Sequence, residues 1–99
     1  MAQSLKINRE VAETVAIQAL NFIAQEPERL GRFLAMSGIG PESLRAAASQ
    51  PTFLAGVLDH VLGDERLLLA FAGTLQLDPA HVGAARELLG GPGWEREVP

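Results

Sequence analysis

Residues 9–25 read REVAETVAIQALNFIAQ. Polar residues recur along this stretch at helical spacing, at Glu10, Thr14, Gln18, Asn21 and Gln25. The other side is apolar and carries Val11, Val15, Ala16, Ala19, Leu20, Phe22 and Ile23. Asn8 precedes the stretch as a suitable N-cap residue. The pattern predicts an amphipathic helix that buries one face.

Prolines and an aspartate divide the rest of the chain into further short helices. Pro27, Pro41, Pro51 and Pro79 each suit the first turn of a helix. Asp64 can cap a helix that begins at Glu65, and Asp78 can cap the helix that begins at Pro79. No stretch of useful length alternates β-branched or aromatic residues with period two, so no strand is expected. We predict an all-α fold, a compact bundle of about five to six short helices, with helices over residues 9–25, 27–37, 41–48, 51–62, 65–76 and 79–89.

Two of these predictions concern particular positions. Gly38 follows the last apolar residue of its helix and is expected to end it in the left-handed conformation. The segment 65–76 is apolar around most of its circumference, which favours a central helix packed on several sides. It carries Leu67, Leu68, Leu69, Phe71, Ala72 and Leu75.

The chain contains an internal similarity between two predicted helical hairpins. A shift of 38 residues places Leu30 on Leu68, Phe33 on Phe71, Leu34 on Ala72, Ile39 on Leu77, Pro41 on Pro79, Leu44 on Val82 and Ala47 on Ala85. Shared capping rules and true duplication explain this match about equally well. Either origin predicts similar apolar ridges, so the hairpins could pack face to face or flank a central helix. Gln76 and Asp78 replace Gly38 and Gly40 in the second copy.

Length, composition and net charge limit the classes of protein to which the chain can belong. The chain has 99 residues, a net charge of −4 and no cysteine, and 47% of its residues are hydrophobic. We expect one helical domain over residues 1–90, with a flexible N-terminus over 1–7 and a flexible tail over 91–99. No apolar run approaches the roughly 20 residues of a membrane span, so a cytoplasmic location without membrane association is expected. No Lys/Arg cluster is apparent in the sequence; Arg29 and Arg32 are the closest pair of arginines.

The turn Gly38-Ile39-Gly40, with Leu44 downstream, resembles the hairpin of helix-hairpin-helix DNA-binding motifs. Backbone amides of such a turn can hold a phosphate, which makes Gly38, Gly40 and Arg45 candidate phosphate contacts. However, Glu42 stands where a phosphate would approach, and Arg45 is the only cation nearby. A structural turn is therefore the favoured interpretation, and nucleic-acid binding is not expected.

Catalytic and metal-binding patterns are weak. His60 is expected to be solvated, opposite the apolar stripe of its helix, and His81 lies in a predicted first turn. His60 and Asp64 have a spacing seen in metal pairs, but Gly63 interrupts the helix between them. No nucleophile with a partner base and no phosphate-binding loop is recognisable. We predict no catalytic residue, no metal site, no cofactor and no enzymatic activity.

Two residues indicate a partner. Ile17 lies on the polar side of the first predicted helix, and Trp94, the only tryptophan, stands in a Gly/Pro-rich tail. An ordinary exposed aliphatic residue is the favoured explanation of Ile17, whereas packing of Trp94 over the end of its own bundle explains it as well as a partner contact does. Both are candidate partner contacts.

Three stretches, 16–20 (AIQAL), 27–34 (PERLGRFL) and 51–59 (PTFLAGVLD), together resemble a family of short alphaproteobacterial proteins known as domain of unknown function 3572. The resemblance covers about residues 11–89. It implies a bacterial, cytoplasmic, stand-alone helical protein and transfers no functional residue.

Our leading hypothesis is a protein-interaction or self-association module, so the chain itself is one expected partner. The alternative is a nucleic-acid-associated protein that uses the turn at Gly38–Gly40, and ligand binding within the bundle ranks last.

Overall fold

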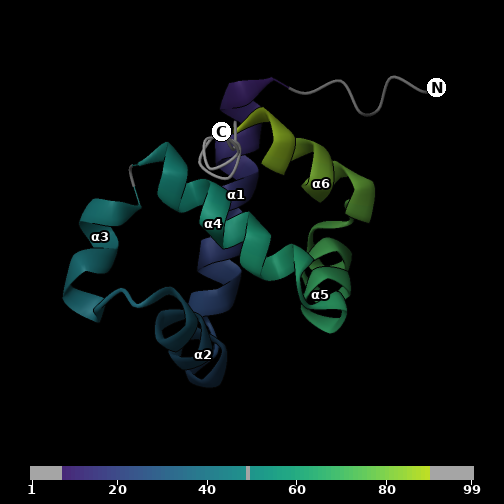
Figure 1. Ribbon diagram of the computed structural model, residues 1–99. Helices are drawn as coiled ribbons and strands as arrows, with labels where there is room; N and C mark the ends of the chain where they lie inside the picture. Colours follow the sequence, from purple (N-terminus) through teal and green to yellow (C-terminus); the bar gives the residue numbers. More distant parts are fainter. Residues whose placement is uncertain (1–7, 49, 90–99) are drawn as a thin grey trace, which may run out of the picture.

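The computed structural model describes residues 8–48 and 50–89, which form six α-helices and one 3-10 turn (Figure 1). They are α1 (Arg9–Ala24), α2 (Pro27–Ser37), η2 (Pro41–Ser43), α3 (Leu44–Ala47), α4 (Pro51–Leu62), α5 (Glu65–Leu75) and α6 (Pro79–Leu88). No strand occurs in the described residues, so the all-α prediction is confirmed. None of the helices in this part of the chain has the length and apolar composition that a membrane span requires.

Side-chain caps start three of the helices, as the sequence predicts. The Asn8 carboxamide oxygen accepts a hydrogen bond of 2.8 Å from the backbone N–H of Val11. Asp64 likewise accepts the N–H of Leu67, at 3.2 Å. Asp78 accepts an N–H at the start of α6. Each cap satisfies a donor that the first turn leaves without an intrahelical partner.

The centre of the molecule is formed by α1 and α4, which cross each other and are both contacted by α6 (Figure 1). Their facing sides are close to completely buried, in keeping with the predicted apolar stripes. Val11, expected on the buried face, is exposed instead, because the neighbouring Ala12 faces the core. Side chains without solvent exposure in this core include Ala16, Ile23, Val57, Leu58, Val61 and Val82.

The prediction that residues 65–76 form a central helix is wrong. Phe71 and Ala72 are the buried residues of α5, while Leu69 is 53% exposed. This helix packs against α4 and α6, and Phe71 also contacts the Phe22 ring of α1, whereas Leu69 and Ala70 are exposed. Apolar residues on most sides of a helix permit burial of each side. How much of the helix surface is buried depends on how many other helices lie against it.

The two similar hairpins, α2–α3 and α5–α6, lie to either side of α4 rather than face to face (Figure 1). Their second helices differ, since α3 has four residues and α6 has ten. Their turns nevertheless share a backbone conformation: Gly38 has φ 76° and Gln76 has φ 57°, both left-handed. The predicted role of Gly38 is thus confirmed, and the second copy adopts the same turn without glycine.

The predictions for the flexible ends, residues 1–7 and 91–99, lie outside the described residues. Trp94 falls within this range.

Candidate functional site

An apolar groove lies between α2 and the first turns of α4. Its volume is about 420 Å³. Phe33 and Phe53 line it, with ring centroids 5.9 Å apart in an edge-to-face arrangement. Met36 stands beside these rings and is 71% exposed. We call this feature the apolar groove. It is lined by Phe33, Met36, Ser37, Ile39, Thr52, Phe53, Gly56, Asp59 and His60.

His60 is half-buried, which contradicts the prediction that it is solvated. Its imidazole packs edge-to-face on Phe33, with ring centroids 5.1 Å apart. Burial lowers the pKa of His60 from its ordinary value of 6.5; Asp64 opposes this shift and Arg32 reinforces it. The sequence places His60 correctly away from the core stripe of α4, but α2 covers that side of the helix.

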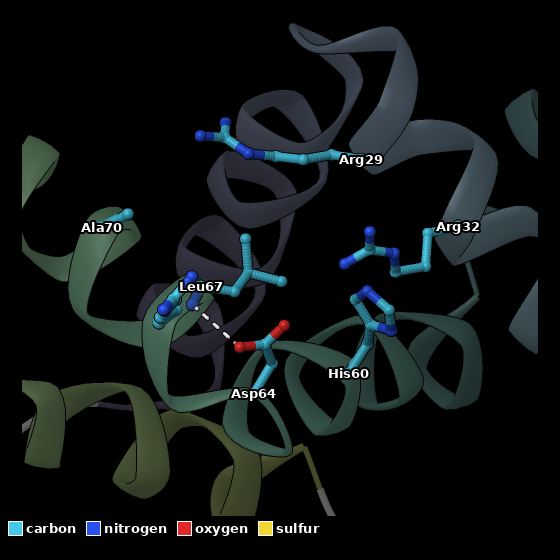
Figure 2. A pocket seen from close by; sticks show the side chains of 7 residues that line it. Arg29, Arg32, His60, Asp64, Leu67 and Ala70 are labelled. Carbon is cyan, nitrogen blue, oxygen red and sulfur yellow. Dashed lines mark hydrogen bonds between the residues drawn. The ribbon is translucent and has the colours of Figure 1, made fainter.

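A second hollow continues from His60 toward α5 (Figure 2). It has a volume of about 370 Å³. Figure 2 shows Arg32 of α2 close to the imidazole of His60, with Arg29 further along the same helix. Arg66 approaches from the first turn of α5, and Asp64 is the one carboxylate among the lining residues. We call this hollow the arginine cleft; Leu67 and Ala70 complete its wall.

The three arginines of the cleft differ in how they are held. Arg29 lies over the ring of Phe22, with its guanidinium carbon 4.2 Å from the ring centroid, and donates to the Phe22 carbonyl at 3.4 Å. Arg32 and Arg66 are exposed, and neither forms an ion pair with a carboxylate of the described residues. The Asp64 carboxylate is already occupied in part as the cap of α5. Cationic groups therefore dominate the cleft.

The apolar groove and the arginine cleft form one continuous depression. His60 lines both, and a hollow of about 410 Å³ joins them. This hollow is bordered by Arg32, Met36, Asp59, His60, Gly63, Asp64 and Glu65. The depression can take an apolar side chain at one end and an anionic group at the other. Within the described residues, no group of three His, Asp or Glu side chains is arranged to hold a metal ion.

The candidate phosphate contacts do not converge on an anion site. Gly38 and Gly40 occupy the predicted turn, but a Cβ built on Gly40 would lie 2.7 Å from Oε2 of Glu42. The Glu42 carboxylate thus lies against the turn, where a phosphate would need to approach. Arg45 is exposed on α3 and lines none of the three hollows.

The candidate partner contacts have different outcomes. Ile17 is 45% exposed on α1, as expected, and lies outside the groove and the cleft. Its role as a contact stays a prediction, and Trp94 lies outside the described residues.

The depression itself was not predicted from the sequence. Arg66 is distant in sequence from Arg29 and Arg32, and it joins them only through the packing of α2, α4 and α5. The close spacing of Arg29 and Arg32 was the one available signal.

The fold and the depression define a small all-α protein with an amphipathic surface groove. The chain belongs to the family DUF3572, described as a protein of unknown function, whose model matches residues 9–92. This match confirms the family indicated by the three sequence stretches. Neither the curated proteins nor the solved structures contain a significant match to the chain.

Proposed function

We propose that this protein is a non-enzymatic interaction module that binds an apolar segment of a partner protein in the apolar groove. The observation that carries this proposal is the exposure of Met36 beside two aromatic rings. A methionine side chain is flexible and polarisable, and such residues are common on surfaces that adapt to a partner. Covering Met36 with an apolar side chain of a partner would remove both from water.

The size of the groove suits such a partner segment. A volume of about 420 Å³ accommodates one or two large apolar side chains rather than a whole folded surface. Full burial of one such side chain contributes about 1.5–3 kcal/mol. An anchor side chain in the groove, with weaker contacts around it, is a common way for a short segment to bind.

Nucleic-acid binding through the turn at Gly38 and Gly40 is the weaker alternative. The Glu42 carboxylate lies against Gly40, and a binder of several phosphates requires several cations at the contact. A cytoplasmic location is part of our proposal, and the cysteine-free sequence is compatible with a reducing compartment. Fractionation of cells that express the protein tests this location.

Site-specific photocrosslinking in cells tests the proposal. A photoreactive phenylalanine derivative placed at Met36 should give one discrete adduct with another protein. The same group at the exposed positions Glu10 and Arg45 should give that adduct weakly or not at all. Mass spectrometry should locate the adduct in an apolar segment whose synthetic peptide binds the protein and loses affinity for the Met36→Glu variant.

Three results would contradict the proposal. The first is that position 36 gives no adduct, and the second is that all three positions give the same adducts. The third is an adduct between two copies of the chain, which would replace a separate partner with self-association.

A further inference from the structure

The arginine cleft adds a charge requirement to the groove, and this inference rests on the proposed function. We infer that the depression recognises a partner segment in which acidic side chains accompany the apolar anchor. The anchor occupies the apolar groove, and the acidic side chains lie in the arginine cleft beside Arg32 and Arg66. The partner is thus an acidic, amphipathic peptide segment.

The local charge differs in sign from the charge of the whole chain. The chain has a net charge of −4, yet the cleft brings together three guanidinium groups and one carboxylate. The adjoining hollow adds Glu65 and Asp59, of which Asp59 is paired with Arg86, so the positive charge is confined to the cleft itself. In the described part of the chain, the ion pairs use other arginines, namely Arg9 with Glu13 and Arg86 with Asp59. Unpaired positive charges collected in one hollow of an acidic protein favour an anionic partner.

The chemistry of the lining suits carboxylates. The exposed guanidinium groups of Arg32 and Arg66 can each offer two parallel N–H donors to one carboxylate. Leu67 and Ala70 line the same hollow with apolar atoms, which weakens screening by water near the charges. Arg29 is fixed on the Phe22 ring, so it contributes positive potential more than a mobile contact.

The spacing along α2 sets the spacing in the partner. Arg32 lines the cleft and Met36 lines the groove, four residues apart on one helix, which corresponds to about 6 Å along the axis. A helical partner would span this distance with an acidic residue three or four positions from its apolar anchor. An extended partner would span it with two positions.

Selection from a random 12-residue peptide library displayed on phage tests the inference. The baits are the wild-type protein, the double variant Arg32→Glu/Arg66→Glu, and the control Arg45→Glu, which changes an exposed arginine outside the depression. Arg29 is left intact because its replacement would remove packing on Phe22. Circular dichroism confirms that all three baits are folded before selection.

The wild-type and Arg45→Glu baits should enrich peptides with an apolar anchor and an acidic residue at the spacing given above. The double variant should still enrich apolar anchors but lose the acidic residues, and selected peptides should bind it about tenfold more weakly. A selected peptide should also lose affinity when its acidic residue is changed to the corresponding amide.

A second readout reports the position of the bound carboxylate. The groups that face or border His60 are Arg32, Asp59, Asp64 and Glu65. A peptide carboxylate bound beside Arg32 adds negative charge near the imidazole and should raise the pKa of His60 in an NMR titration. The amide form of the same peptide should leave this pKa closer to that of the free protein.

The outcomes separate the inference from the function on which it rests. Apolar peptides without acidic enrichment, or acidic enrichment that survives in the double variant, would overturn the inference and leave the apolar groove as a binding site. Acidic peptides without an apolar anchor, or no enrichment at all, would overturn both. Tighter binding of a labelled DNA 20-mer than of the selected peptides would also overturn both, because it would identify a polyanion as the ligand.

Discussion

Replacing Gln76 with glycine should stabilise the protein. Gln76 ends α5 in the left-handed conformation, with φ 57° and ψ 41°, and it is the one non-glycine residue with positive φ in the described part of the chain. The turn requires this conformation, because the N–H of Leu77 donates to the carbonyl of Ala72 at 2.8 Å across it. The Gln76 side chain is exposed, so its removal costs little packing.

Two opposing effects set the size of the change. A residue with a Cβ loses about 1–2 kcal/mol in the left-handed region, and glycine avoids this cost. Glycine also loses about 0.5–1 kcal/mol more backbone entropy on folding than other residues do. The net gain for Gln76→Gly is therefore about 0.5–1 kcal/mol, or a rise of roughly 2–8 °C in Tm for a domain of this size.

The first hairpin offers a matched control with the opposite sign. Gly38 has φ 76°, and a Cβ at this position would meet no atom within 4 Å, so Gly38→Ala tests backbone strain alone. It should destabilise the protein by about 0.5–1 kcal/mol. Urea denaturation and thermal melts of both variants measure the two effects. A Gln76→Gly variant less stable than wild type would refute the reasoning, because it would show that the left-handed turn does not strain glutamine.

Three further predictions concern the core, an ion pair and the titration of the groove. Phe71→Ala should cost about 3–5 kcal/mol in urea denaturation, because Phe71 is fully buried against the ring of Phe22; a loss below about 1 kcal/mol would contradict this packing. Asp59→Asn should cost at most about 1 kcal/mol, because the pair with Arg86 is partly exposed, and the loss should shrink at high salt. The lowered pKa of His60 means that the unfolded chain binds the proton more readily. The contribution of His60 to stability should then be complete above its unfolded pKa of 6.5 and decline as the pH falls through this value toward the lower folded pKa. Urea titrations should show a weaker pH dependence in this range for His60→Gln, and an unchanged dependence would contradict the assignment.

Local chemistry explains why the helix boundaries could be predicted from the sequence. Asn8, Asp64 and Asp78 cap the helices that follow them, and each cap acts over two or three residues of chain. The left-handed turn at Gly38 is of the same kind, since glycine adopts it without strain. Interactions of this range are fixed by neighbouring residues and do not depend on how the helices pack.

Burial depends on which helices meet, and here prediction failed. Leu69 is exposed although its helix is apolar on most sides, because the neighbouring helices cover the part of α5 that carries Phe71 and Ala72. His60 is half-buried although it lies off the core stripe of α4, because Phe33 of α2 packs on it. The groove and the cleft could not be predicted for the same reason, since they exist only where α2, α4 and α5 come together.

The Met36 methyl group provides the most direct test of the apolar groove as a docking surface. Selective ¹³C labelling of the methionine methyl groups gives signals for Met1 and Met36, and Met36→Leu assigns the second. A peptide identified by photocrosslinking or by phage selection should shift the Met36 signal in a saturable manner. Binding of that peptide without any change at Met36 would contradict the account, because the partner would then lie on another surface.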